Sequence, residues 1–300
     1  MDMTQNKCCR HGASLRRRRR RRRKILCFII FSCSIIAVAV FVAVESRMIT
    51  SGDGGTNRYD VEAGNNTYDN AVIENSKISG KNKIQNNQSM LDDIMNSTQY
   101  PKQLKDLALK NEEALEFVYD YPAEHVKEHT IDLTEEASMD SVPLFVQWDK
   151  RWGYEKYSGN FFAASGCGPT TLSMVVVYLT HNRDASPIAV AKYSKEAGYS
   201  VDGSGSSWTL ISEGCMHYGV KAKAVALDES RMKAELDEGH PIVVNVGPGD
   251  FTDTGHFMVI TGYDDEGFSI NDPNSIEKSG KRWLFRNISS QIRAVWSMYV

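Results

Sequence analysis

The feature that most constrains this 300-residue chain is an apolar segment near its N-terminus. Residues 25–44 are 20 consecutive residues without a charge, and the arginine run 16–23 and Lys24 precede them directly. Twenty helical residues at 1.5 Å each match a bilayer core of about 30 Å. Because basic residues stay on the cytoplasmic side of a span, we expect a basic cytoplasmic tail over 1–24, a single transmembrane helix over 25–44, and an extracellular remainder.

Two other interpretations of this N-terminal region remain open. The apolar segment also suits a cleaved signal peptide, although it exceeds the usual apolar stretch of about 7 to 15 residues. The arginine run resembles a nucleic-acid-binding patch, but its place beside a membrane span favours a role in setting membrane topology or in contact with anionic lipids. The first 47 residues carry 12 basic and 2 acidic residues, whereas the remainder carries 23 basic and 36 acidic residues. An acidic exported part disfavours nucleic acid as a partner.

The six cysteines do not form a disulfide framework. Four of them belong to the tail or the apolar segment, namely Cys8, Cys9, Cys27 and Cys33. Only Cys167 and Cys215 follow, which is too few to staple an exported domain. Cys215 falls inside an expected helix over 208–218, where a cysteine is usually a small buried apolar residue.

Two segments of different character separate the apolar run from the rest of the chain. Residues 45–97 are rich in Asn, Gly, Ser, Asp and Lys, which predicts a flexible spacer. Residues 98–139 contain apolar positions at helical spacing, which predicts one or two helices that end before Pro122. These helices are either a cap packed on the following domain or a pro-segment that blocks its cleft. Helical periodicity alone favours the cap.

Residues 140–300 have the pattern of a compact domain. Helices are expected at 170–180, 187–197 and 208–218, and a fourth begins at a cap on Asp228 and ends at Gly239. Strands are expected afterwards, at 242–246, 256–263, 268–271 and 294–299. Helices followed by an antiparallel sheet define an α+β fold.

A cysteine lies at the start of the most apolar of these helices, in the motif Gly166-Cys167-Gly168-Pro169-Thr170. Pro169 fits the first helical turn, where its missing N–H costs nothing. The positive end of the helix dipole favours the thiolate of Cys167. The two glycines are expected to keep bulk away from the sulfur. These features make Cys167 a candidate nucleophile.

His256 and Asp272 complete a candidate catalytic set. Cys, His and Asp in this chain order are typical of a papain-like thiol hydrolase. His256 would accept and return a proton, and Asp272 would orient its imidazole. A three-residue turn at 265–267 places both side chains on one face of the sheet. However, it pairs Asp272 with Ile260, about 13 Å from His256, so contact requires a turn re-centred near Asp264 or a β-bulge.

Four motifs in order carry a resemblance to a known family. They are Val142-Pro143-Leu144-Phe145-Val146-Gln147, Ser165-Gly166-Cys167-Gly168-Pro169-Thr170, Gly255-His256-Phe257 and Asn271-Asp272-Pro273. Together they resemble the bacterial papain-like cysteine peptidases related to the double-glycine, or bacteriocin leader, peptidases, in a stand-alone, membrane-anchored branch. The resemblance implies a papain-like fold, with the N-terminal helices packed on the antiparallel sheet. It also implies that the oxyanion hole is formed by Gln147 and the backbone N–H of Cys167.

The stretch between Gln147 and Cys167 is longer than in the leader-processing relatives. It carries six aromatic residues: Trp148, Trp152, Tyr154, Tyr157, Phe161 and Phe162. These either line a substrate cleft or pack in the core, and packing is the commoner role. The loop 202–208 is a further candidate for the lining of the cleft, and the loop 247–251 is a candidate for shaping its leaving-group side.

The sequence therefore predicts a membrane-anchored extracellular cysteine peptidase that works through an acyl-enzyme, with Cys167, His256, Asp272 and Gln147 as its catalytic residues. The alternatives are a cell-wall amidase or peptidoglycan endopeptidase, and a non-catalytic peptide-binding module on the same fold. We expect a peptide or protein substrate, with cell-wall peptide as one possibility. We also expect a monomer with no cofactor, no metal and no nucleic-acid partner.

Overall fold

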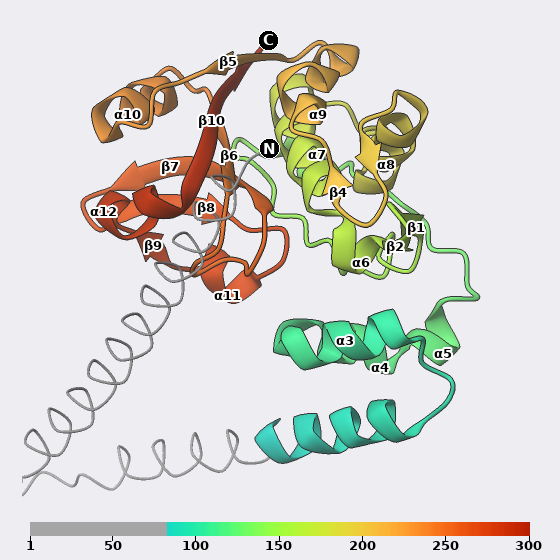
Figure 1. Cartoon of the computed structure of the whole chain (residues 1–300). Coiled ribbons are helices and arrows are strands. Elements are labelled where there is room, and N and C mark those ends of the chain that lie inside the picture. Colours follow the sequence, from blue (N-terminus) through green and yellow to red (C-terminus); the bar gives the residue numbers. More distant parts are fainter. Residues whose placement is uncertain (1–82) are drawn as a thin grey trace, which may run out of the picture. The chain divides into compact units, whose positions relative to one another are not determined.

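The computed structural model describes residues 83–300 (Figure 1). The expected cytoplasmic tail, transmembrane helix and most of the spacer lie outside the described residues. Within residues 83–300, no helix combines the length and apolar character that a bilayer span requires.

The C-terminal part of the expected spacer is helical. A helix covers residues 83–96, and Ile94 on this helix is fully buried. Met90 and Leu91 pack beside it against the next helices. Apolar residues at i, i+1 and i+4 form one face of a helix, so this stretch buries more apolar surface than its polar composition suggests. The prediction of a flexible spacer is therefore wrong for residues 83–96.

The next segment is helical, as predicted. Its elements are α3 (Lys102–Lys110), the 3-10 helix η1 (Glu112–Ala114), α4 (Leu115–Tyr119), α5 (Tyr121–Glu124) and the 3-10 helix η2 (Glu136–Ser138). The buried residues of α3, η1 and α4 form one cluster with Phe161 and Ala163 of the following domain. Helical structure continues past Pro122, because this proline occupies the first turn of α5, where it displaces no hydrogen bond. We call residues 83–124 the N-terminal helical segment.

The first half of the main domain is mostly helical. Its elements are β1 (Lys156–Tyr157), β2 (Asn160–Phe161), α6 (Phe162–Ser165), α7 (Cys167–Thr180), α8 (Pro187–Glu196), β3 (Ser200–Val201), β4 (Gly205–Ser206), α9 (Thr209–Ser212) and the 3-10 helix η3 (Gly214–Tyr218). The central helix α7 is apolar on all sides and is buried over most of its length. It begins three residues earlier than predicted, at Cys167.

The second half is a six-stranded antiparallel sheet with short helices. Its elements are β5 (Lys221–Ala224), α10 (Glu229–Asp237), β6 (Ile242–Val246), β7 (His256–Asp264), β8 (Gly267–Asn271), α11 (Ile276–Ser279), β9 (Arg282–Trp283), α12 (Phe285–Ile288), the 3-10 helix η4 (Ser289–Gln291) and β10 (Ile292–Tyr299). The strand order is β5-β10-β6-β7-β8-β9. Every predicted strand is present, and the short strands β5 and β9 were not predicted.

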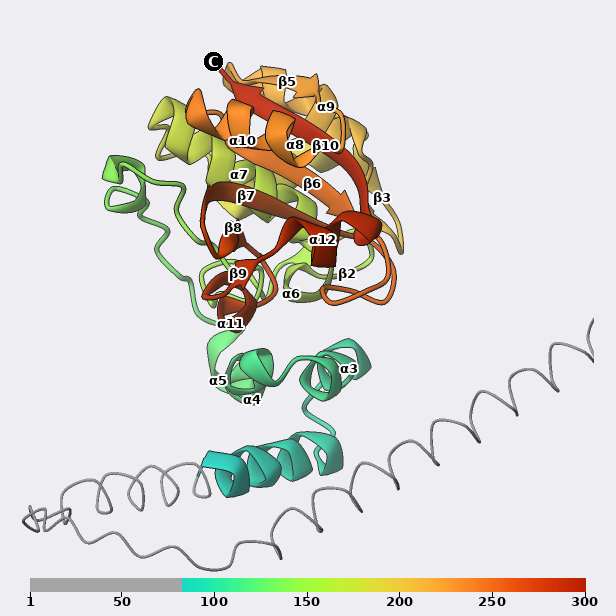
Figure 2. The same ribbon diagram turned by 90° about the vertical axis from the view of Figure 1, so that its left-hand side faces the viewer.

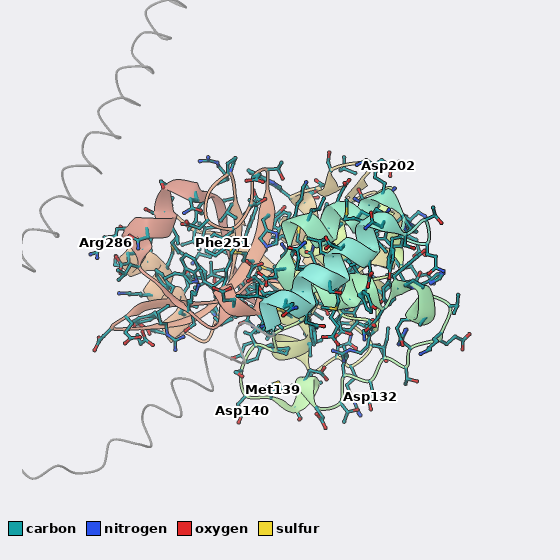
Figure 3. All side chains as sticks on the ribbon, turned by 90° about the horizontal axis from the view of Figure 1, so that it is seen from below. Asp132, Met139, Asp140, Asp202, Phe251 and Arg286 are labelled. Carbon is teal, nitrogen blue, oxygen red and sulfur yellow. The ribbon has the colours of Figure 1, made fainter. Side chains whose placement is uncertain are left out.

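The sheet separates two apolar cores. One face, with Val243, Val259 and Met298, packs against α7. The other face, with Val244 and Met258, is covered by α10 and α12. Figures 1 and 2 show the sheet beside α7, and Figure 3 shows Phe251 in the sheet half and Asp202 in the helical half. The α+β prediction is confirmed.

Candidate active site

Cys167 is the first residue of α7, and its side chain is half-buried. The flanking glycines have a different role from the one predicted. A methyl group on Gly168 would lie 2.5 Å from Oγ of Ser206, and one on Gly166 would lie 2.6 Å from the ring of Phe162. Such distances are too short for a carbon atom. The glycines therefore let Phe162 and β4 approach the start of α7, rather than clearing space around the sulfur.

His256 and Asp272 are brought together by an irregular hairpin between β7 and β8. Asp264 pairs with Gly267, and the register shifts between Ile260 and Gly262. The expected three-residue turn is therefore wrong, and the alternative of a bulge is confirmed. Beyond the bulge Asn271 lies opposite Val259, so the next residue, Asp272, comes within reach of His256.

The contact between His256 and Asp272 is short and buried. His256 Nε2 donates to Asp272 Oδ1 over 2.6 Å. The two side chains are 7% and 1% exposed, respectively. Asp272 Oδ1 also accepts from the backbone N–H of Asn274 over 2.8 Å, and the N–H of Asp272 donates to Oγ of Ser279 over 2.9 Å. The carboxylate is therefore fixed by the loop that follows it.

The ionisation of the site follows from these contacts. Burial lowers the pKa of His256, but the adjacent Asp272 carboxylate and the Cys167 sulfur together outweigh this and raise the pKa to about 10. Burial raises the pKa of the Cys167 thiol, but the His256 imidazole and the backbone N–H groups of Phe257 and Gly168 together outweigh this, so the net pKa falls below the ordinary value. Because Nε2 is occupied by Asp272, Nδ1 is the nitrogen left to face the thiol. The pair favours a thiolate beside an imidazolium.

Gln147 lies at the same site, as the resemblance implied. Its backbone N–H donates to the carbonyl of Pro273 over 2.7 Å, which ties it to the residue after Asp272. Its Nε2 donates to the carbonyl of Ala163 over 2.7 Å. The amide group has a second N–H, and its Oε1 is buried without a partner among the described residues. An unpaired buried polar atom costs about 1–3 kcal/mol, which is unusual for a side chain with a structural role only.

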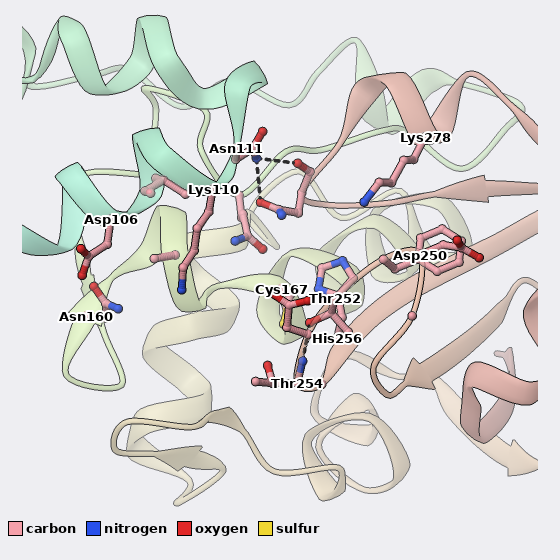
Figure 4. A pocket seen from close by; sticks show the side chains of 18 of the residues that line it. Asp106, Lys110, Asn111, Asn160, Cys167, Asp250, Thr252, Thr254, His256 and Lys278 are labelled. Carbon is pink, nitrogen blue, oxygen red and sulfur yellow. Dashed lines mark hydrogen bonds between the residues drawn. The ribbon is translucent and has the colours of Figure 1, made fainter. Parts of the chain in front are cut away.

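Two cavities meet at Cys167. One, of about 490 Å³, is lined by Cys167, His256, Gln147, the loop 249–255 and residues of α3 (Figure 4). The other, of about 680 Å³, is lined by Cys167, the loop 203–208 and residues 245–248. The predicted lining role of the loop 202–208 is confirmed for residues 203–208, and residues 247–251 also line the two cavities. The favoured interpretation of residues 98–139 as a packed cap did not include a contribution of α3 to the cleft, because apolar spacing indicates packing; only the alternative of a pro-segment placed this region at the cleft.

The aromatic residues between Gln147 and Cys167 pack rather than line these cavities. Trp152 is buried, and its Nε1 donates to the carbonyl of Val146 over 2.9 Å. Tyr157 is also buried, and its hydroxyl hydrogen bonds with that of Ser206 at 2.6 Å. None of the six aromatics lines either cavity. The packing interpretation is confirmed.

Within residues 83–300, no group of three or more His, Cys, Asp or Glu side chains is arranged to hold a metal ion.

The family of this chain is identified by a family model. The model of the Peptidase_C39-like family matches residues 139–300. Among solved structures, the peptidase domain of Streptococcus ComA, a bi-functional ABC transporter involved in a quorum-sensing pathway, is 19% identical; the match covers 53% of this chain and 96% of that one, with a TM-score of 0.38. A putative C39-like peptidase from Bacillus anthracis is 18% identical, with coverage of 53% and 95% and a TM-score of 0.33. No curated protein matches the chain.

Proposed function

Because the chain belongs to the Peptidase_C39-like family and has a papain-like α+β fold, we propose that it is a cysteine peptidase that acts through Cys167. The observation that carries this proposal is the buried pair of His256 and Asp272 beside a half-buried cysteine at a helix N-terminus. A buried ion pair next to a thiol of lowered pKa is costly to maintain for packing alone, and perturbed pKa values gather at functional sites.

The proposed reaction has two steps. The Cys167 thiolate attacks the scissile carbonyl carbon, and His256 gives its proton to the leaving amine, which leaves a thioester on Cys167. Water then attacks the thioester while His256 takes a proton from it, and the thiolate is released. Asp272 keeps Nε2 of the imidazole occupied throughout, so that Nδ1 is the nitrogen that exchanges the proton.

The negative charge on the carbonyl oxygen needs donors in both steps. The backbone N–H of Cys167 has no partner inside α7, because the first N–H groups of a helix have none. The second N–H of the Gln147 amide is the other proposed donor. One such donor contributes about 3 kcal/mol to the transition state.

The proposed location is the outer surface of the cell membrane. It rests on the arginine run and the uncharged residues 25–44, which together suit a single span with the N-terminus in the cytoplasm. Protease shaving of intact cells tests it: an antibody against residues 139–300 should lose its signal, and an intact signal would overturn the location without affecting the chemistry.

The chemistry is tested by the rate at which iodoacetamide alkylates Cys167 as a function of pH, in the full chain in detergent. Mass spectrometry of the digested protein follows the peptide that contains Cys167 and so distinguishes it from the other five cysteines. We expect fast labelling of this peptide that persists below pH 6 and is lost in His256→Ala, whereas Cys215→Ser should label Cys167 at the wild-type rate. Labelling that rises only near the ordinary thiol pKa of about 8.5, with or without His256, would instead support a non-catalytic binding module.

A further inference from the structure

The loop that carries Asp272 is held from outside the main domain. Asn111, between α3 and η1, donates from Nδ2 to the carbonyl of Asn274 over 2.9 Å and to its Oδ1 over 3.0 Å (Figure 4). Glu113 in η1 accepts at Oε2 from the backbone N–H groups of Ile276 and Glu277, over 2.7 and 3.0 Å. Its Oε1 accepts from the hydroxyl of Ser275.

These bonds act on the turn that fixes the catalytic carboxylate. The N–H of Asn274 donates to the same Oδ1 of Asp272 that accepts from His256. Ser275 pairs with Asp272 along the backbone and also caps α11 at the N–H of Lys278. A shift of Asn274 or Ser275 therefore moves the Asp272 carboxylate relative to the imidazole. Asn111 and Glu113 are the side chains of the N-terminal helical segment that restrain Asn274 and Ser275.

Glu113 is well suited to this role. The first N–H groups of a helix have no partner within it, and a negative side chain at that end is stabilised by the helix dipole. In α11 the cap residue Ser275 accepts from the third of these groups, the N–H of Lys278, and Glu113, more than 160 residues away in sequence, accepts from the first two.

The same segment forms a wall of the cleft without filling it. Gln103, Asp106 and Lys110 on α3 line the cavity of about 490 Å³ that also contains Cys167 and His256. A blocking pro-segment would place side chains on the thiol, whereas here the thiol remains half-buried beside an open cavity. Asn111 and Glu113 themselves lie outside residues 139–300, the part that matches the family, whereas the loop that they contact lies inside it.

We propose that Asn111 and Glu113 are positioning residues for Asp272, and that the N-terminal helical segment is a permanent part of the active site rather than a removable pro-segment. This inference rests on the proposed peptidase function. It deepens that function by assigning two residues that act through the Asp272 loop rather than on the sulfur.

The test uses three variants of the full chain. We call the contacts of Asn111 and Glu113 with residues 274–277 the clamp. Glu113→Gln removes one acceptor oxygen from it. Asn111→Asp keeps the Oδ1 that accepts from Glu113 N–H but replaces the donor that faces Asn274. Glu116→Gln is the matched control, because this exposed residue of α4 loses the same charge away from the loop.

Three quantities are measured: kcat and KM on a peptide substrate, the pH dependence of Cys167 alkylation, and hydrogen exchange of residues 272–280. We expect kcat to fall about 10- to 100-fold, the range seen when residues that orient a ligating or catalytic group are changed, with KM within about twofold. Alkylation of Cys167 at pH 6 should slow by about tenfold, since one pKa unit is a tenfold change in thiolate. Exchange of 272–280 should rise, and Glu116→Gln should match the wild type in all three.

The outcomes separate this proposal from the function it rests on. A rise in kcat in either clamp variant would show a blocking segment and overturn the proposal. The proposal would also be overturned if turnover fell only in proportion to a lower melting temperature, while Cys167 alkylation and hydrogen exchange at 272–280 stayed unchanged. That result would leave the proposed peptidase function unaffected. Faster exchange and slower alkylation in a protein that cleaves no peptide would support the clamp and overturn the function.

Discussion

The surroundings of Cys167 and Cys215, the two free cysteines within residues 83–300, differ in almost every respect. Both lie in helical turns of the same half of the domain. Cys215 is fully buried among apolar side chains, and burial raises its pKa to about 11. Cys167 begins a helix at the meeting point of two cavities, and the imidazole of His256 outweighs burial and lowers its pKa. One residue type thus becomes a packing group or a candidate nucleophile according to the charges around it.

The largest effect on the comparison of the two cysteines is expected when the sulfur of Cys167 is removed. Cys167→Ala removes the nucleophile, so turnover of any peptide substrate should fall at least about 10⁴-fold, to the background of the remaining site. Cleavage assayed by mass spectrometry is the measurement, with Cys215→Ala as the matched control at full activity. Residual cleavage in Cys167→Ala at more than a hundredth of the wild-type rate would exclude it as the nucleophile.

Asp272→Asn should have the next largest effect, because it removes the charge that distinguishes the two thiols. Without the carboxylate, the pKa of His256 should fall from about 10 and that of Cys167 should rise toward its ordinary value. The ion pair exists above the pKa of the thiol and below the pKa of the imidazole, so its pH window should narrow from both sides. A loss of about 10²- to 10⁴-fold in kcat is expected, and an unchanged pH–rate profile would contradict the assigned role.

Gln147→Ala should lower kcat by about 10²-fold, the effect of one lost oxyanion donor, and should leave the alkylation of Cys167 unchanged. This result would sharpen the comparison, because it separates stabilisation of the oxyanion from activation of the thiol. The rates of peptide cleavage and of iodoacetamide labelling are measured side by side. If the rates of cleavage and labelling fell together, Gln147 would instead be supporting the fold of the cleft. Its hydrogen bond to the carbonyl of Ala163 could have that role, so thermal melting of the variant is measured as well.

The smallest effect should come from Cys215→Ser. A hydroxyl in this apolar site without a partner costs about 1–3 kcal/mol of stability, whereas kcat should not change. Urea unfolding followed by tryptophan fluorescence measures the cost. A change in kcat without a loss of stability would mean that Cys215 affects the active site and is not only a packing group.

Much of the fold and of the site follows from sequence patterns. The apolar character of α7, the caps of α10 and the apolar runs of β6 and β7 depend on neighbours in sequence, so their places were predicted closely. The segment 83–96 was missed because three apolar residues in a polar stretch become a helix only when α3 and α4 offer a surface to cover. The helix α3 was predicted, but its position in the wall of the cleft depends on tertiary packing that apolar spacing does not reveal.

The sequence by itself determined which groups could react: a cysteine at the start of a helix, a histidine at the start of a strand, and an aspartate after the next strand. Tertiary structure alone decided whether they meet. The bulge near Thr261 shifts the register by one residue and brings Asp272 to His256, and the clamp of Asn111 and Glu113 holds that loop across more than 160 residues. Local patterns carry information over a few residues, whereas register and long-range hydrogen bonds depend on the whole packed chain, because a one-residue slip along a strand changes which side chains face each other.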